Sequence, residues 1–296
     1  MNSPIAPPPA SAPPAGSPAP FPRPGSSLYH ALATVPAAQR PALRQWLRWW
    51  HDVASIPFGV SDPGVAETKL RWWQQELADA ARGQAHHPLL RDWPGDAQDP
   101  SARPDAPLWH AQIEAALQLV QQTRWMDEAS VQRHARQGTG AACEGAAWLL
   151  GARSEAARHA ARELGLGLHQ AHQLARLGQD ARLGWVHPAI SVLQTHGVRA
   201  HELSKPAETP PAGLASLVQH LHHQARDTLR GALHAVEALP SPERRACQPL
   251  CVLAHIQLAQ MVAIEARSDR LLHERIVLTP LRKWWIAQQV RWGLLR

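Results

Sequence analysis

Two short polar sets interrupt otherwise apolar helical stretches of the sequence. The first set, His51, Asp52 and Ser55, follows a run of tryptophans, and His51 and Ser55 are one helical turn apart. The second set recurs at i, i+3, i+4, i+7 and i+11, which places its members along one side of a helix: His169, His172, Gln173, Arg176 and Asp180. Imidazole, guanidinium, hydroxyl and carboxylate groups bind anions, protons or metal ions. These residues are therefore candidates for function.

The second set has more than one interpretation. The other side of the same helix is apolar and includes Leu164, Leu168 and Leu174. A helix with its polar side in water is therefore the most common explanation. A polar strip that lines an internal cavity is the functional alternative. The pair His169 and His172 could also hold a transition metal, although pairs at this spacing are frequent by chance.

Helices must position both sets, because nearly all of the chain after Ser27 has an apolar period close to 3.6. A helix over residues 36–56 is expected to bury one apolar stripe, formed by Leu43, Trp46, Leu47, Trp50 and Ala54. Further helices are predicted over residues 65–82, 108–122, 127–137, 141–150, 155–177, 214–239, 243–272 and 280–295. Residues 178–197 are expected to be looser, and Gly138-Thr139-Gly140 predicts a break or a close-packing point. No set of strands is visible, so the predicted fold class is all-α, a single large helical bundle.

Composition narrows the classes of protein. Residues 1–26 contain ten prolines and predict a disordered tail, which leaves 27–296 as the folded domain. The segment 250–266 carries four polar residues and predicts a buried helix instead of a membrane span. Three cysteines are too few for a disulfide framework, and no secretory signal is visible, so a cytoplasmic location is expected.

Charge and aromatic content suggest partners. The net charge is +6, and the scattered arginines favour anionic partners such as phosphates or lipid headgroups. No recognition-helix motif is present, so nucleic acid is not an expected partner. Thirteen tryptophans indicate either large core side chains or an interface or apolar cavity.

Several separated runs resemble the squalene/phytoene synthases. They are Gly25-Ser-Ser-Leu-Tyr-His-Ala, Leu47-Arg-Trp-Trp-His-Asp and the long run from Ser61 through Trp72-Trp73 to Leu77, followed in order by Gly138-Thr139, the run 178–184 and Leu281-Arg-Lys-Trp-Trp. The resemblance implies an all-α isoprenoid synthase bundle with a central cavity. Family members join two prenyl diphosphates head to head, with Mg²⁺ held between two aspartate-rich motifs because the departing diphosphate must be neutralised.

The first of these motifs is altered in this sequence. Where the family has Asp-Asp-x-x-Asp-Glu, this chain has His51, Asp52, Ser55 and Ile56. The two ligand positions one turn apart are thus His and Ser, and Asp52 alone keeps an acid. Ser27 and Arg48 match family positions that contact diphosphate.

The second motif is altered as well. Arg176, Gln179 and Asp180 stand where the family has Asp-x-x-Glu-Asp, so Asp180 is the one principal ligand carboxylate that remains. His169 and His172 replace the usual Gln and Asn, and His134 replaces a Tyr. A lone carboxylate beside Arg and His is a poor Mg²⁺ site, so no metal site and no cofactor are expected.

The resemblance and these changes together suggest a function. We expect a catalytically degenerate member whose cavity binds an isoprenoid diphosphate or a similar anionic lipid, or which acts as an assembly or scaffold factor for a protein partner. The expected ligand-binding residues are Ser27, Arg48, His51, Ser55, His134, His169, His172, Arg176 and Asp180. The alternative is an active head-to-head prenyltransferase with an altered Mg²⁺ site, in which Asp52 and Asp180 would be the residual acids.

The end of the chain suggests where such a protein acts. The helix predicted over 280–295 mixes Trp, Leu and basic residues. This composition suits a helix on an anionic membrane surface, which would place the protein at the inner face of the membrane. The interpretation that is slightly favoured is that the helix packs back onto the bundle.

Overall fold

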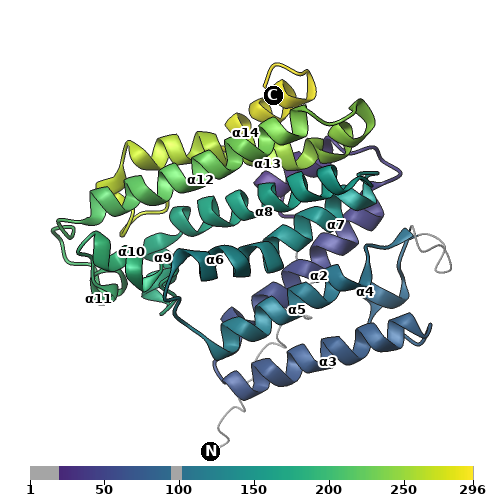
Figure 1. The fold of residues 1–296 in the computed structure, drawn as a ribbon, viewed down its shortest axis with the longest axis horizontal. Coiled ribbons are helices and arrows are strands. Elements are labelled where there is room, and N and C mark those ends of the chain that lie inside the picture. The colour runs from purple at the N-terminus through teal and green to yellow at the C-terminus, as the bar shows by residue number, and fades with distance from the viewer. Residues whose placement is uncertain (1–19, 95–101, 296) are drawn as a thin grey trace, which may run out of the picture.

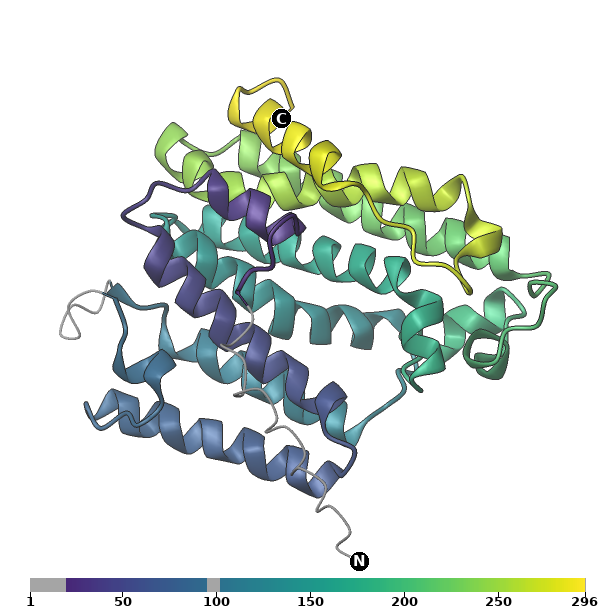
Figure 2. The same cartoon turned by 180° about the vertical axis from the view of Figure 1, so that it is seen from behind.

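A computed structural model describes residues 20–94 and 102–295, and every regular element in these ranges is helical (Figure 1). The long helices lie side by side from α3 at one edge to α13 and α14 at the other, in both views (Figures 1 and 2). The all-α prediction is therefore confirmed. The elements of the first half are α1 (Ser27–Ala33), α2 (Arg40–Gly59), α3 (Pro63–Ala81), α4 (Pro88–Arg91), α5 (Ala106–Gln121), α6 (Glu128–Ala135), the π-helix η2 (Arg136–Gly140) and α7 (Ala141–Leu149).

The second half of the chain contains the long helices farthest from α3 (Figure 1). The elements there are α8 (Glu155–Ala175), α9 (Leu177–Arg182), α10 (Ile190–Thr195), α11 (Ala200–Ser204), α12 (Leu214–Glu237), α13 (Ser241–Glu265), the 3₁₀ turn η3 (Ser268–Arg270) and α14 (Pro280–Arg291). Helix α8 is central, since it packs against α6, α7, α12, α13 and η2. The helix that carries the second polar set is therefore surrounded by other helices.

Side-chain caps define several of the helix starts. Ser26 Oγ accepts the backbone N–H of Tyr29 at 3.1 Å, and Asp62 Oδ1 accepts that of Val65 at 3.0 Å. Such bonds satisfy amides that have no partner within the first turn. Ser26 belongs to residues 20–26, a segment that the sequence assigns to the tail and that leads directly into α1. Residues 1–19 lie outside the described part.

Tryptophans fill the core around α2. Trp46 and Trp49 are fully buried, and both contact Trp109 of α5, with ring centroids 4.7 and 4.5 Å apart. Trp46 Nε1 donates to the Ala142 carbonyl at 2.8 Å, which satisfies its buried polar atom. The interpretation of tryptophans as core side chains is thus confirmed for this cluster.

The predicted stripe on α2 is partly wrong. Leu43 and Trp46 are buried as predicted, but Trp49 and Val53 complete the buried face, whereas Trp50 and Ala54 are only half-buried. The buried face turns because Trp49 inserts between α5 and α3, where it contacts Trp73 at 6.2 Å. Helix α2 also begins at Arg40, since residues 36–39 form a separate turn.

Other expected boundaries also differ. Residues 178–197, expected to be looser, include most of α9 and all of α10. Helix α13 ends at Glu265 instead of 272, and the chain then turns through η3. Helix α13 is long and apolar enough to cross a membrane by composition, but half of its most apolar stretch is buried. It packs on α8, α12 and α14, in agreement with its interpretation as a buried helix.

The Gly138-Thr139-Gly140 run is the close-packing point that the sequence predicts. It forms the π-helix η2 between α6 and α7, a distortion that often occurs at functional sites. Gly165 of α8 lies against it, and a Cβ on Gly165 would be 2.6 Å from the Thr139 carbonyl oxygen. Glycine therefore allows α8 to approach η2 backbone to backbone.

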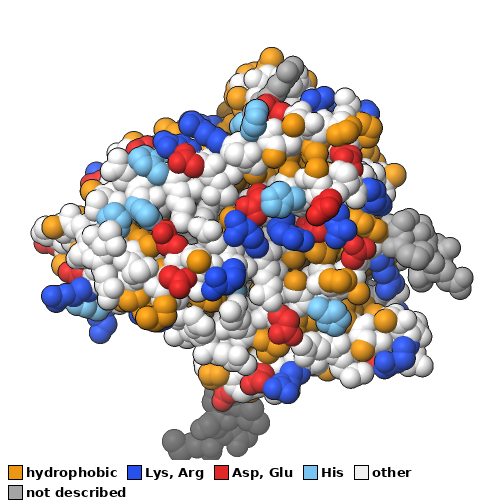
Figure 3. Space-filling model, viewed as in Figure 1, with side chains coloured by type: hydrophobic (Ala, Val, Ile, Leu, Met, Phe, Trp, Pro, Cys, Tyr) orange, Lys and Arg blue, Asp and Glu red, His pale blue; other side chains and the backbone are white. Residues whose placement is uncertain are grey.

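Acidic and basic side chains are interspersed on the face shown in Figure 3. Many arginines of the chain form ion pairs within one helix or between neighbouring helices, as Arg136 does with Glu163 at 2.6 Å. The basic charge of the chain is thus distributed among acids on this face.

Candidate functional site

The predicted site residues lie in two groups. One group, Arg48, His51, Asp52 and Ser55, lies on α2. The other is the polar strip of α8 and α9, which runs from His169 and His172 through Arg176 to Asp180, with His134 of α6 beside it. The rings of Phe58 and Trp185 are 4.6 Å apart, which brings the end of α2 next to the loop that follows α9. Within the described residues, no hydrogen bond or ion pair joins the two groups directly.

Arg176 and Asp180 form the charged centre of the strip. Arg176 Nε and Nη2 donate to Asp180 Oδ1 at 2.9 and 2.6 Å. His187 Nε2 lies 2.9 Å from the other carboxylate oxygen. Burial by itself raises the pKa of Asp180, but hydrogen bonds from His187 and Arg176 outweigh it, so the pKa is lowered. Both carboxylate oxygens of Asp180 thus have cationic or polar partners.

His169 and Thr139 link α8 to the π-helix. Gln173 Nε2 lies 2.8 Å from His169 Nε2, and His169 Nδ1 lies 3.1 Å from Thr139 Oγ1. The amide nitrogen of Gln173 can only donate a hydrogen bond. His169 Nε2 therefore accepts it, and His169 Nδ1–H donates to Thr139 Oγ1. Burial lowers the pKa of His169 well below its ordinary value, followed by the effect of His134. His169 is therefore a neutral imidazole with both nitrogens in hydrogen bonds.

His134 is also neutral. Its ring packs 4.8 Å from Trp125 and 6.0 Å from His169, and its Nδ1 lies 3.2 Å from Gln118 Oε1. Burial, and to a smaller degree His187, lowers the pKa of His134 to about 4. Burial therefore keeps the His134 ring uncharged, so it can offer a hydrogen bond but no positive charge.

His172 lies on α8 one turn before Arg176, and its side chain is exposed. Neighbouring protein atoms desolvate the imidazole, and this effect, ahead of that of Arg176, lowers its pKa to about 4. His172 can therefore offer a hydrogen bond beside the pair of Arg176 and Asp180 without adding a charge.

The α2 group has its own pair and its own cover. Arg48 Nε donates to Asp52 Oδ2 at 2.8 Å, and Ser55 Oγ donates to the His51 carbonyl at 2.6 Å. The Phe21 ring lies 5.5 Å from the His51 ring and 5.5 Å from the Arg48 guanidinium carbon. Residues just before α1 thus cover the polar flank of α2.

Both acids that remain from the motifs are therefore paired with an arginine one turn earlier on the chain. Asp52 pairs with Arg48, and Asp180 pairs with Arg176. The hydroxyl of Ser55 is bonded to its own helix. Mg²⁺ requires several anionic oxygens, and these residues do not supply them. The residues present do not fit the family's metal.

Two cations, Arg275 and Lys283, are absent from the predicted set. Besides burial, Arg275 contributes to the lowered pKa values of His172 and Lys283, and Lys283 contributes to that of His30 on α1. Burial, then Arg275, lowers the pKa of Lys283. Ser27, predicted to bind diphosphate, is half-buried on α1 near His30. Arg275 lies in a loop without helical period, so only its position beside the basic C-terminal helix could have indicated it.

His187 is a further residue that the sequence did not indicate. It lies in the loop after α9, where no periodic pattern marks it, and it bonds Asp180. With Gln173 it also lines a pocket between α6, α8 and α12. The other polar residues of this pocket are Glu128, Gln132, Gln170 and Gln224. Gln170 Oε1 is buried there without a hydrogen-bond partner.

The helical architecture of the described residues places the protein in the isoprenoid synthase class of folds. A family model described as squalene/phytoene synthase matches residues 21–282. The chain belongs to the squalene/phytoene synthase family. No curated protein sequence matches it.

Solved structures agree on the fold. A dehydrosqualene synthase in complex with ligand matches with a TM-score of 0.74 and 16% identity, over 90% of this chain and 91% of that one. The squalene synthase HpnC from Alicyclobacillus acidocaldarius matches with 0.67 and 15%, over 81% and 88%. YisP from Bacillus subtilis subsp. subtilis strain 168 matches with 0.65 and 18%, over 88% and 89%. At these identities the likeness concerns the fold.

Proposed function

We propose that this family member binds an isoprenoid diphosphate or a similar anionic lipid and does not cleave the bond between the isoprenoid carbon and the diphosphate. The observation that carries this proposal is the pairing of both residual acids, Asp52 with Arg48 and Asp180 with Arg176. Without a divalent cation, the main electrostatic stabilisation of a departing diphosphate is lost. The same arginines can instead hold an anion, by exchanging a carboxylate for a phosphate.

The ligand would lie along the polar strip. Its head would meet Arg48 on α2, Arg176 beside Asp180, and Arg275, which contributes to the lowered pKa of His172, with Lys283 close to Arg275. The neutral histidines would offer hydrogen bonds without adding charge. The apolar interior of the bundle would take the isoprenoid chain. An assembly or scaffold role with a protein partner is the alternative if no such ligand binds.

Calorimetry with farnesyl and geranylgeranyl diphosphate tests the proposal directly. We expect binding in EDTA that Mg²⁺ does not strengthen, and no squalene- or phytoene-type product. Arg275→Met combined with Arg48→Met should weaken binding by more than about tenfold, since each charged hydrogen bond contributes about 1.5–3 kcal/mol. Arg71→Met, an exposed change on α3, is the matched control and should bind normally.

Two outcomes would overturn the proposal. Mg²⁺-dependent product formation that Asp180→Ala abolishes would establish the active prenyltransferase instead. Absence of binding in every condition would leave the partner role. As a converse test, His51→Asp, Ser55→Asp and Arg176→Asp together restore the acids of the family motifs. This variant should gain Mg²⁺-dependent binding of the diphosphate.

We also propose that the protein works at a membrane surface. Helix α14 packs onto α13 and α1 through Ile286, Ala287 and Val290, so it does pack back onto the bundle. Exposed apolar side chains nevertheless lie on its outer side and just after its end: Leu281, Trp284 and Trp285 on the helix, and Trp292 and Leu294 after it. Exposed tryptophans beside Arg282 and Arg291 suit the interface of an anionic bilayer.

A further inference from the structure

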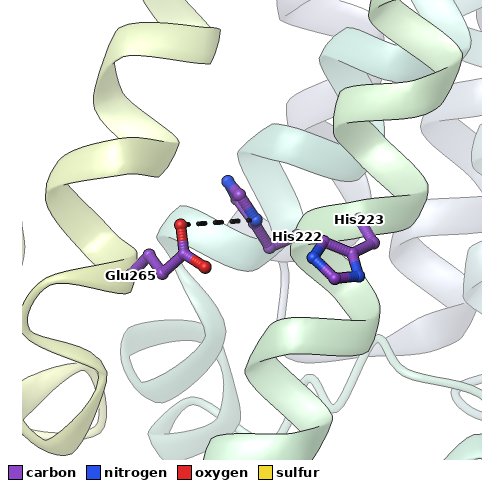
Figure 4. Close-up of side chains that lie close together, drawn as sticks. All are labelled: His222, His223 and Glu265. Carbon is purple, nitrogen blue, oxygen red and sulfur yellow. Dashed lines mark ion pairs between the residues drawn. The ribbon is translucent and has the colours of Figure 1, made fainter.

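Two histidines and a glutamate converge between α12 and α13, away from every residue assigned to the candidate site. His222 and His223 project from the middle of α12, and Glu265 is the last residue of α13 (Figure 4). One ligand atom from each of these side chains lies within 4.8 Å of the other two. The three groups come from two helices that pack on each other, so the fold itself brings them together.

His222 and Glu265 lie close together but form no hydrogen bond. The two side chains face each other in Figure 4, with His222 Nδ1 3.8 Å from Glu265 Oε2. This separation is too long for a hydrogen bond. His222 is only 4% exposed, and its Nδ1 has no hydrogen-bond partner. A buried nitrogen without a partner is costly unless another group completes its bonding.

A bound cation would complete it. Two ligand atoms, each about 2.1 Å from one tetrahedral ion, are separated by about 3.4 Å. The observed 3.8 Å between His222 and Glu265 is close to this separation, and small rotations would bring in His223. Glu265 also places a negative charge at the C-terminal end of α13, where the helix dipole opposes it. A cation at this point relieves that repulsion as well.

We propose that His222, His223 and Glu265 form a binding site for a zinc-type divalent cation. Two imidazoles and one carboxylate are borderline ligands that favour Zn²⁺ over Mg²⁺. Three protein ligands leave one position for water. The ion would fasten the end of α13 to the middle of α12, immediately before the chain turns through η3 toward Arg275. This inference is independent of the proposed diphosphate binding.

Two basic neighbours, Arg226 and Arg230, repel a cation at this point. They follow on the same helix and, after burial, contribute to the lowered pKa of His222. Arg226 is paired with Asp227 at 3.0 Å, which reduces its effect. A second group of possible ligands, Glu76, Asp79 and His86, carries no such proposal. Glu76 there already accepts the backbone amides of His86 and His87, each at 2.6 Å.

The test uses the full chain, stripped with EDTA and titrated with zinc sulfate in the absence of any isoprenoid. We expect one Zn²⁺ per chain by calorimetry, a rise in Tm, and, with Co²⁺ as a probe, visible absorption bands of a tetrahedral site. Glu265→Gln and His223→Ala change accessible side chains and should leave the fold intact. Each should weaken binding by more than about 100-fold, since losing an outer hydrogen-bond partner of a ligand already costs about 10–100-fold.

Matched controls are available elsewhere on the surface. His159→Ala and Glu114→Gln change an exposed histidine and an exposed glutamate outside the cluster, and both should bind Zn²⁺ like the wild type. Zinc binding that survives in both cluster variants would place the ion elsewhere, for example at a cysteine, and would overturn the proposal. No binding to the wild-type chain would overturn it too. Neither result bears on the diphosphate titration.

Discussion

At the scale of single residues, the arginine that replaces a family acid determines what Asp180 can do. The pair between Arg176 and Asp180 is mostly buried, with side-chain exposures of 24% and 11%, whereas Arg48 and Asp52 are about one-third exposed. Removing one partner of a buried pair leaves an uncompensated charge, and an exposed pair contributes little. The two pairs should therefore respond differently to the same substitution.

We predict that Arg176→Met lowers the free energy of unfolding by about 1–3 kcal/mol at pH 7, and Arg48→Met by less than about 1 kcal/mol. The pKa of Asp180 is lowered in the folded chain. The stabilisation by its partners is therefore present above the unfolded pKa and is lost as pH falls through the folded one. Urea unfolding between pH 7 and pH 3 should show the Arg176→Met difference shrinking toward acid. Equal losses in the two variants would contradict the argument.

His134 provides a second prediction, and like Asp180 it makes the protein less stable toward acid. Its pKa is about 4 in the folded chain against 6.5 ordinarily, so only the unfolded chain takes up a proton between these values. Stability therefore falls as pH drops below 6.5 and levels off below about 4. By linkage, this one group accounts for about 2 kcal/mol between pH 7 and pH 5.

We expect His134→Tyr, which introduces the side chain usual in the family, to reduce this acid sensitivity. Urea midpoints at pH 7 and pH 5 measure it, and the difference between the two should shrink in the variant by up to about 2 kcal/mol. His159→Ala, an exposed change on α8, should leave the pH dependence as it is. An unchanged pH dependence in His134→Tyr would show that the His134 ring takes up its proton in the folded chain as well.

The chemistry of the site was only partly predictable from residue types. The i, i+4 spacing of Arg176 and Asp180 permits their pair, and the resemblance placed both residues on one wall. The protonation of His134 and His172 could not be predicted, because it depends on how many protein atoms surround each ring. His187 could not be predicted either, since it reaches Asp180 from a loop.

At the scale of helices, glycines decide how closely the elements approach. Gly178 of α9 lies directly against Leu272, and a Cβ there would be 2.5 Å from the Leu272 Cα and carbonyl oxygen. The neighbour is backbone and cannot rotate away. Gly231 of α12 is the matched contrast, because a Cβ on it would have no atom within 4 Å.

Gly178→Ala should therefore destabilise the protein by about 1–3 kcal/mol, as an overpacked contact. Gly231→Ala should stabilise it by about 0.5–1 kcal/mol, because alanine favours a helix interior over glycine. Thermal and urea unfolding of the two variants give the comparison. A stable Gly178→Ala variant would show that α9 and the segment after η3 can separate without cost.

Periodicity predicted which segments are helical more reliably than it predicted their buried faces and ends. The long amphipathic helices α8 and α12 begin at the expected residues, Glu155 and Leu214. The face of α2 was misjudged because Leu47, Trp50 and Ala54 are as apolar as the residues that are buried, and only packing against α5 and α3 distinguishes them. The short helices α9 and α10 were missed because one or two turns are too few to show a period.

At the scale of the whole molecule, the fold carries the polar strip on α8 and α9 and exposes tryptophans at and just after α14. Isoprenoid chains partition into bilayers, so a protein that binds them gains by meeting the membrane. Arg275, which contributes to the lowered pKa of His172, and its neighbour Lys283 belong to the same C-terminal segment as the exposed tryptophans of α14. A membrane bound at α14 would thus lie beside the cations proposed to hold the ligand head.

Sedimentation with vesicles tests this arrangement. We expect binding to anionic phosphatidylglycerol vesicles, weaker binding to neutral phosphatidylcholine, and weakening by salt because charge attraction is screened. Trp284→Ala with Trp285→Ala should reduce the affinity by more than about tenfold, since each half-exposed ring can bury apolar area worth about 1 kcal/mol or more. Trp72→Ala removes a ring on α3 that is exposed to the same degree as Trp285, 47%, and should not change binding. If the double variant binds vesicles as well as the wild type does, α14 only completes the bundle, and its tryptophans have another partner.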